Sequence, residues 1–375
     1  MLLRCTSFEQ MREEIEERNK PIIIFGAGVI GTVTVSEILK QYNLMKRVLF
    51  YVDNSRNLQG QNIDIDNRVI NVKSVDALNC VGENTTVIIA VSRYAEVLEQ
   101  LRGMSCVSRM VCYIMPMMCI HNFCGDISGG FPILSDQPMI PKKIHYMWLG
   151  KKPIPDNLQK CIDSWKRFCP DYEMIRWDES NYDISKNHYM EQAYEAGAYG
   201  FVPDYARLDI LYEYGGIYMD TDVEMIRSVD DMLYQSAFCG VEKWQTINFG
   251  GCSGAVKGHR AVGQFLRERK KISFFNEDGS QNRNTCGFYD TKVALGKGYK
   301  INGKTQNIMG MNIYAFDYFH PYDYMSGQTF ETRNTYTVHR FNGGWMNERM
   351  QQENKNAVKV YNEIYQECMQ KCMEK

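Results

Sequence analysis

The sequence predicts an α/β fold in two parts, each built around a sheet that contains parallel strands. Three observations lead to this prediction. The length of 375 residues suits about two domains. An apolar run, Pro21 to Phe25, is followed by a glycine-rich turn and a helical pattern. A second strand–helix–strand pattern begins at Lys143, beyond a segment rich in Gly, Ser, Asp and Pro.

The composition is that of an ordinary globular protein, with 44% hydrophobic and 23% charged residues. A net charge of -2 gives no electrostatic basis for binding nucleic acid. The 13 cysteines include no C-x-x-C pair, and the first residues lack the apolar region of a signal peptide, so we expect reduced thiols and a cytoplasmic protein. The longest apolar stretch, Val111 to Ile120, is too short to span a bilayer and is predicted to be a buried strand, with shallow membrane contact as the alternative.

The N-terminal part contains a G-x-G-x-x-G pattern formed by Gly26, Gly28 and Gly31. It follows the first apolar strand and opens a helix, and the next strand, Val48 to Val52, leads into Asp53. This order is the dinucleotide-binding layout, in which glycines allow close backbone approach, the helix N-terminus faces a phosphate and the acidic residue contacts a ribose. The pattern therefore predicts a nucleotide site.

A purely structural role is the alternative for the same residues. The glycines would then serve a tight turn, and Asp53 would form a turn with Asn54 and Ser55. An amphipathic helix at about 7–18 and further strands at 86–91 and near Ile114 complete a small doubly wound sheet. Residues 20–120 resemble the small Rossmann-like domains attached to sugar-modifying enzymes of surface-polysaccharide pathways. Both roles stay open at this point.

The composition change divides the chain into a first domain at 1–121, a linker at 122–140, a second domain at 141–350 and a C-terminal helix at 351–375. In the second domain a strand ending at Trp148 precedes a helix that we expect to be capped by Asp156 and to stop before Pro170. The next strand ends at Trp177, which completes a βαβ unit and predicts a parallel sheet.

A second helix of this domain, Pro203 to Tyr214, places Asp204 and Arg207 on one face. It leads into a short apolar strand that ends in Asp220 and Asp222. Two carboxylates at the end of a buried strand are costly unless a cation meets them. Oxygen ligands of this kind suit Mg²⁺ or Mn²⁺ bound to a diphosphate. The alternative for Asp220 and Asp222 is a solvated turn. The alternative for Asp204 and Arg207 is an ion pair on the helix surface.

Four sequence blocks carry a resemblance to a known family: 140–148, 204–208, 214–222 and 337–345. In this order they resemble the DXD-motif glycosyltransferases of family 32, which include capsular-polysaccharide transferases and the catalytic domains of large glucosylating toxins. The resemblance spans more than half of the chain. It implies a GT-A fold for the second domain and retention of anomeric configuration in the transfer.

The resemblance also implies a metal site and a donor site. Asp220, Asp222 and His339 would hold Mn²⁺ (or Mg²⁺), while a structural histidine is the alternative for His339. The donor contacts would be Trp148 on the nucleotide base, Asp204 on the sugar hydroxyls, Tyr218 nearby, and Trp345 over the diphosphate. Arg207 would stabilise the sugar or the developing charge, and Asp220 would reach the ribose, the sugar or a metal-bound water. Core packing is the alternative for Trp148 and Tyr218.

This chain departs from the family pattern at two positions. Gly344 and Pro203 stand where relatives commonly carry Ser, so a hydroxyl contact to the β-phosphate is absent at Gly344 or replaced by the backbone N–H. No side chain is assigned as nucleophile or base. The segment 242–251 and the run Phe288-Tyr289-Asp290 are expected to shape the acceptor side.

The sequence therefore predicts a metal-dependent retaining glycosyltransferase. It would transfer a hexose from a nucleotide sugar, with a UDP-sugar expected, to a glycan or lipid-linked oligosaccharide in surface or capsular polysaccharide biosynthesis. We expect a cytoplasmic protein, with peripheral contact at the inner membrane face as an option. The alternatives are a toxin-like protein glucosyltransferase effector, an NAD-dependent oxidoreductase that uses the first domain, and an inactive sugar-binding module, which the intact Asp204, Arg207, Asp220 and Asp222 disfavour.

Overall fold

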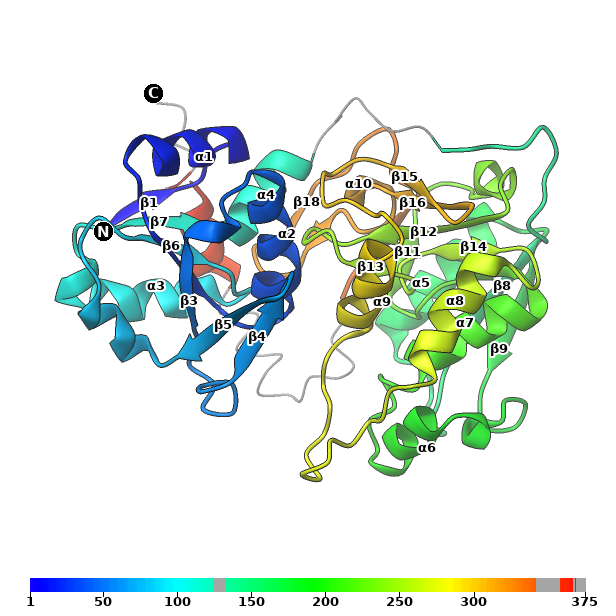
Figure 1. Ribbon diagram of the computed structural model, residues 1–375. Helices are drawn as coiled ribbons and strands as arrows, with labels where there is room; N and C mark the ends of the chain where they lie inside the picture. Colours follow the sequence, from blue (N-terminus) through cyan, green and yellow to red (C-terminus); the bar gives the residue numbers. More distant parts are fainter. Residues whose placement is uncertain (125–131, 342–357, 367, 369–375) are drawn as a thin grey trace. The chain divides into compact units, whose positions relative to one another are not determined.

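A computed structural model describes residues 1–124, 132–341, 358–366 and 368 (Figure 1). The chain divides into two compact units. The first contains Met1–Cys124, Met325–Gly327 and the described C-terminal residues, and the second contains the remaining described residues. The chain thus re-enters its first unit at Met325–Gly327 and again at its C-terminal end. The predicted Trp345 and much of the predicted C-terminal helix lie outside the described residues, while 358–366 are helical.

The first unit is built on a seven-stranded sheet in the order β1-β7-β6-β2-β3-β5-β4. All pairs are parallel except the hairpin of β4 and β5. The strands are β1 (Leu2–Arg4), β2 (Ile22–Phe25), β3 (Val48–Val52), β4 (Asn62–Ile65), β5 (Arg68–Lys73), β6 (Thr86–Ile89) and β7 (Val111–Ile114). Because β2 lies between β3 and β6, the strand order reverses there, and ligands of open α/β sheets bind at such points.

The helices of the first unit correct one prediction. They are α1 (Phe8–Glu17), α2 (Ser36–Gln41), α3 (Tyr94–Arg102) and α4 (Met115–Phe123), with a π-helical segment, η1 (Ile30–Val35), leading into α2. The apolar stretch from Val111 to Ile120 is not one buried strand, because α4 replaces the strand after Ile114. Pro116 lies in the first turn of α4, where its fixed φ suits a helix and its missing N–H costs nothing.

The second unit contains an eight-stranded mixed sheet in the order β15-β16-β12-β14-β10-β8-β9, with β13 paired to β12. The expectation of a parallel sheet holds for β8 with β9 and for β8 with β10, whereas β14 is antiparallel to both of its neighbours. The strands are β8 (Lys143–Met147), β9 (Glu173–Trp177), β10 (Gly216–Tyr218), β12 (Ala237–Val241), β13 (Ile247–Asn248), β14 (Ser253–Ala255), β15 (Gln306–Ile308) and β16 (Met311–Tyr314).

Two small sheets complete the second unit. One pairs β11 (Val223–Met225) with β19 (Thr337–His339), and the other pairs β17 (Tyr322–Asp323) with β18 (Gln328–Thr329). In the first, Val223 lies opposite His339. Since β11 directly follows Asp222, this antiparallel pairing carries His339 to the carboxylates from more than a hundred residues away in sequence.

The α-helices of the second unit are α5 (Asp156–Phe168), α6 (His188–Glu195), α7 (Pro203–Tyr214), α8 (Arg260–Arg269), α9 (Cys286–Leu295) and α10 (Phe316–Phe319). Asp156 does not cap α5 as predicted. Pro155 occupies the capping position and makes no side-chain hydrogen bond, so Asp156 is the first helical residue, where its charge favours the helix N-terminus.

A buried cluster around Ile144, Trp165, Ile217 and Phe238 joins α5 to the sheet and forms much of the core of the second unit. Trp165 is fully buried, and its Nε1 donates to the carbonyl of Val223 at 2.7 Å. This contact fixes the strand that follows the two carboxylates. Among the described residues, no helix has the length and apolar character needed to cross a membrane.

Candidate active site

The helix α7 begins and ends at the residues that the sequence predicts. Pro203 is its first residue and Gly215 its C-cap, with φ 66° at Gly215. A β-carbon on Gly216 would lie 2.9 Å from Nε2 of His145, and that nitrogen is 2.8 Å from the carbonyl oxygen of Gly215. These glycines and His145 therefore fix the turn that delivers the chain into β10 and on to Asp220.

Asp204 and Arg207 do not form a surface ion pair, because both side chains are buried. Nη2 of Arg207 lies 3.2 Å from Oδ1 of Asp204 and 3.4 Å from Oδ2 of Asp220. Its Nε donates to the carbonyl of Pro203 at 3.0 Å. Burial favours neutral Arg207, but the negative charge of Asp220 and its neighbours outweighs it and raises the pKa of Arg207. The guanidinium is thus a fixed positive charge between two carboxylates.

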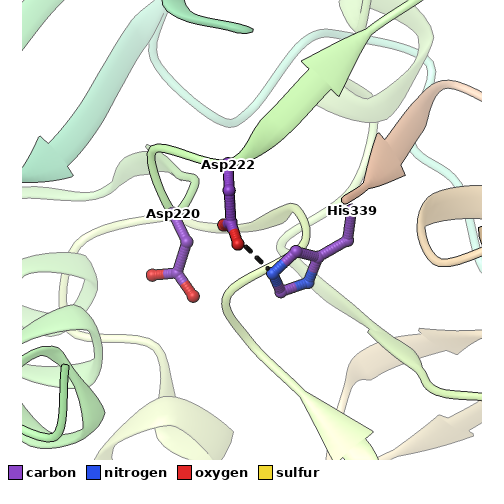
Figure 2. Close-up of side chains that lie close together, drawn as sticks. All are labelled: Asp220, Asp222 and His339. Carbon is purple, nitrogen blue, oxygen red and sulfur yellow. Dashed lines mark ion pairs between the residues drawn. The ribbon is translucent and has the colours of Figure 1, made fainter. Parts of the chain in front are cut away.

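Asp220, Asp222 and His339 lie together at the end of β10 (Figure 2). One potential ligand atom from each residue lies within 4.8 Å of the others. Oδ1 of Asp222 is 3.2 Å from Nε2 of His339. The backbone N–H of Arg340 donates to the carbonyl of Asp222 at 2.9 Å and completes the connection between the two segments.

The electrostatics of this cluster suit a cation. Burial raises the pKa of Asp220 although Arg207 opposes the shift. Burial alone would lower the pKa of His339, but Asp222 and Asp220 reverse the direction and raise it. In the described part of the chain, Nδ1 of His339 is buried without a hydrogen-bond partner. Carboxylate oxygens suit Mn²⁺ and Mg²⁺, and an imidazole nitrogen is a common ligand of divalent metals, so these residues fit a divalent metal.

A turn of two glycines shapes the same site, and it lies in the segment 242–251 that is expected from the sequence to shape the acceptor side, although its contact with Asp220 was not predicted. The carbonyl of Gly250 accepts from the N–H of Asp220 at 2.8 Å. A β-carbon on Gly250 would lie 2.1 Å from Oδ2 of Asp220 and 3.0 Å from Nη1 of Arg207. A β-carbon on Gly251 would lie 1.9 Å from Cε1 of His320. Only glycine leaves room here, and the Gly-Gly pair was the available signal.

Two further residues contact Asp204 and Arg207, and the sequence did not identify them. The hydroxyl of Tyr189, on α6, donates to Oδ2 of Asp204 at 3.4 Å. Sγ of Cys286, the first residue of α9, lies 3.7 Å from Nη1 of Arg207. Neither residue belongs to a recognisable sequence motif, since both reach the site only through the packing of α6 and α9.

The remaining predicted donor residues lie as follows. Trp148 follows β8 and is partly exposed, and its Nε1 donates to the carbonyl of Lys152 at 2.7 Å, which orients the ring. Tyr218 is 1% exposed, and the guanidinium of Arg207 lies 5.8 Å from its ring centroid. No hydrogen bond recorded among the described residues joins Trp148 to the carboxylate cluster.

In the first unit, the glycine-rich turn uses the carboxylate of Asp53 internally. Oδ2 accepts from the N–H of Ala27 at 2.8 Å, and Oδ1 accepts from the N–H of Ser55 at 2.8 Å. Gly26 has φ 115°, and a β-carbon on Gly31 would lie 1.9 Å from the carbonyl oxygen of Gly26. A β-carbon on Gly28, by contrast, would meet no described atom within 4 Å, so the space beside this glycine is open.

Comparisons with known proteins concern the same part of the chain. The family described as "Glycosyltransferase sugar-binding region containing DXD motif" matches residues 155–239, which include Asp204, Arg207, Asp220 and Asp222. Inositol phosphoceramide mannosyltransferase 3 of Schizosaccharomyces pombe is 33% identical over 143 residues, covering 36% of this chain and 38% of that protein. Subversion of eukaryotic traffic protein A of Legionella pneumophila is 28% identical over 166 residues, which cover 36% of this chain and 25% of that protein.

Among solved structures, PaToxG Glycosyltransferase shares 20% identity and a TM-score of 0.34, covering 42% of this chain and 70% of that one. A likeness at this level does not establish the fold. The chain spans well under two thirds of the length of either curated relative above. The family match and the sequence relatives support a DXD-motif glycosyltransferase.

Proposed function

We propose that the chain is a metal-dependent, retaining glycosyltransferase with a GT-A type second unit and a Rossmann-like first unit. It transfers a hexose from a nucleotide sugar, with UDP as the expected nucleotide, to a glycan or lipid-linked acceptor. The observation that carries this proposal is the meeting of two arrays, Asp204–Arg207–Asp220 and Asp222–His339, at the end of β10. A donor needs both a sugar contact and a site for its diphosphate.

The roles follow from charge and position. Asp220, Asp222 and His339 would hold Mn²⁺ or Mg²⁺, which supplies Lewis-acid stabilisation of the departing nucleotide diphosphate. Asp204 accepts hydrogen bonds from sugar hydroxyls, and the fixed charge of Arg207 keeps it in place. Trp148 offers a partly exposed aromatic face for the nucleotide base.

The setting that we propose is the assembly of a surface or capsular polysaccharide, at the cytoplasmic side of the membrane. The mannosyltransferase relative is named for a lipid that carries inositol, which supports a hydroxyl-rich, lipid-linked acceptor. In the first unit we propose at most a nucleotide contact by the turn around Gly28. The engagement of Asp53 by two backbone amides argues against an NAD-dependent oxidoreductase, because the ribose contact of that reaction needs this carboxylate.

A second candidate is a toxin-like effector that glycosylates a protein. The similarity to Subversion of eukaryotic traffic protein A favours it, since that name describes an action on eukaryotic cells. Both candidates use the same donor site, so they differ only in the acceptor. Incubation of the protein and a labelled donor with eukaryotic cell lysate would label a discrete protein band under the second candidate and a lipid or polysaccharide fraction of a bacterial extract under the first.

The donor test uses the purified chain with Mn²⁺ and a panel of UDP- and GDP-sugars, following release of the nucleotide diphosphate. We expect turnover of one donor, its loss with a chelator, and a fall of at least about 100-fold for Asp222→Asn. Asp136→Asn, at an exposed aspartate, serves as the matched control. Turnover that survives both the chelator and Asp222→Asn would contradict the metal role.

A further inference from the structure

Glu242 begins the segment 242–251, which is expected from the sequence to shape the acceptor side, and its carboxyl group has no individual role in the arrangement described so far. Glu242 follows β12 directly and opens the turn to β13, where its N–H donates to the carbonyl of Thr246 at 2.9 Å. Nδ2 of Asn248 donates to Oε1 of Glu242 at 2.6 Å. No described hydrogen bond or ion pair reaches Oε2, and the side chain is partly exposed.

A chain of hydrogen bonds connects this carboxyl group to the metal-binding aspartate. Oδ1 of Asn248 accepts from the N–H groups of Gly250 at 2.6 Å and Gly251 at 3.2 Å. The carbonyl of Gly250 in turn accepts from the N–H of Asp220. Asn248 therefore holds Glu242 with one side of its amide and the Gly-Gly turn with the other. These hydrogen bonds set the position of Glu242 relative to Asp220.

The candidate site lies within electrostatic reach of Glu242. His339 and Arg207 both act electrostatically on its carboxyl group, as does the neighbouring Lys243. Burial nevertheless raises the pKa of Glu242 above its usual range. A carboxyl group that has one oxygen held by Asn248 and the other without a described partner, within electrostatic reach of Arg207, is suited to accept a hydrogen bond from a substrate hydroxyl.

We infer that Glu242 binds the acceptor, with its Oε2 accepting a hydrogen bond from a sugar hydroxyl of the acceptor molecule. This inference rests on the proposed function and extends it to the acceptor. The donor sugar is already served by Asp204 and Arg207 on α7, whereas Glu242 reaches the site from the β12–β13 turn. Glu242 thus approaches from a different element than the donor contacts and orients the attacking hydroxyl.

The test compares two reactions of the same donor: hydrolysis by water and transfer to an added sugar. The probes are methyl glycosides of glucose, galactose and mannose at millimolar concentration. Glu242→Gln keeps an oxygen for Asn248 and replaces the second oxygen by an NH₂ group. Glu277→Gln, at an exposed position, is the matched control. The ratio of transfer to hydrolysis and the KM for the acceptor are measured for each protein.

We expect Glu242→Gln to lower the transfer-to-hydrolysis ratio about tenfold or more, mainly by raising the acceptor KM, because one hydrogen bond to a charged group is lost. A ratio within twofold of wild type would overturn the inference. So would wild-type protein that hydrolyses the donor yet transfers to none of the probes, since the acceptor would then not be a sugar hydroxyl. Wild-type protein without any donor turnover would instead overturn the proposed function itself.

Discussion

Arg207 and Asp220 approach to 3.4 Å although they come from different elements, the buried helix α7 and the turn after β10. The same Nη2 atom is 3.2 Å from Asp204, so one guanidinium connects the proposed sugar contact to the proposed metal site. Because Arg207 is buried, its charge is little screened by water, and both carboxylates depend on it. This guanidinium therefore lies at the centre of the candidate site.

Arg207→Lys tests that geometry without removing the charge. Lysine offers a point charge in place of a planar fork and is not expected to reach both carboxylates from α7. We expect donor turnover, measured as kcat/KM, to fall about 100-fold, comparable to the loss of one preorganised donor in an active site. Circular dichroism would check that α7 still folds. A variant with near-normal kcat/KM would show that the bridge between Asp204 and Asp220 is dispensable.

Gly250→Ala tests the steric requirement beside Asp220. The added methyl group would lie 2.1 Å from Oδ2 of Asp220, so either the carboxylate or the turn must shift. We expect weaker Mn²⁺ binding by calorimetry and a loss of donor turnover of at least about tenfold, because small displacements of reacting groups are costly. Gly296→Ala is the control, since its β-carbon meets its nearest neighbour at an ordinary 3.5 Å. Equal Mn²⁺ affinity in both variants would contradict the prediction.

The burial of neutral His145 leads us to expect a loss of stability in acid. Burial lowers its pKa to about 4, and its neutral ring accepts from Nε1 of Trp177 at 3.1 Å through Nδ1. Protonation of Nδ1 would break this bond, so the unfolded state binds the proton more readily. The contribution of neutral His145 to the free energy of unfolding is therefore complete above pH 6.5. It is lost as the pH falls from 6.5 toward 4, and it amounts to about 3 kcal/mol at most.

The measurement for His145 is the urea midpoint of the second unit between pH 7 and pH 4.5. We expect the wild-type midpoint to fall more steeply than that of His145→Gln, which lacks the titrating ring. His145→Gln should also be less stable at pH 7, because the contacts to Trp177 and Gly215 are disturbed. Parallel pH profiles for the two proteins would show that His145 does not cause the acid sensitivity.

The contacts of Tyr361 lead us to expect that the C-terminal helix stabilises the first unit. Its ring is 1% exposed and meets Tyr94 of α3 edge-to-face at a centroid distance of 4.7 Å, while its hydroxyl donates to Glu96 at 2.6 Å. We expect Tyr361→Ala to cost about 3–5 kcal/mol, the usual loss for a large buried aromatic. Faster amide hydrogen exchange in α3 would report it, and Val360→Ala, exposed on the same helix, should leave exchange unchanged.

Proline and glycine at element ends and short apolar runs explain which elements the sequence predicts well. Pro203 and Gly215 mark the ends of α7, and the apolar run of β3 has the predicted bounds, 48–52. The prediction for Val111 to Ile120 was wrong because an apolar run has no period that separates a strand from a buried helix, and only Pro116 marks the change. The strands β1 and β4 were not predicted, since both are short and partly exposed.

The residues of the candidate site likewise divide into those that the sequence identifies and those that it does not. Asp204, Arg207, Asp220 and Asp222 are close in sequence, so their patterns and spacing point to a common site. Gly250 and Tyr189 reach it through the turn after β13 and the packing of α6. The Gly-Gly pair indicates a tight turn but not its contact with Asp220, and nothing in the sequence marks Tyr189. The internal use of Asp53 by Ala27 and Ser55 likewise depends on a turn geometry that the G-x-G-x-x-G pattern does not specify.

Asp220, Asp222 and His339 are proposed to bind the metal that the donor needs, and the other roles at the site depend on this one. The most direct measurement is Mn²⁺ binding, by electron paramagnetic resonance, to the wild type, Asp222→Asn and His339→Ala, each with and without the nucleotide diphosphate. We predict binding to the wild type that tightens with the nucleotide, and affinity reduced at least about tenfold in both variants. Unchanged Mn²⁺ affinity in both variants would place the metal elsewhere and contradict the proposed site.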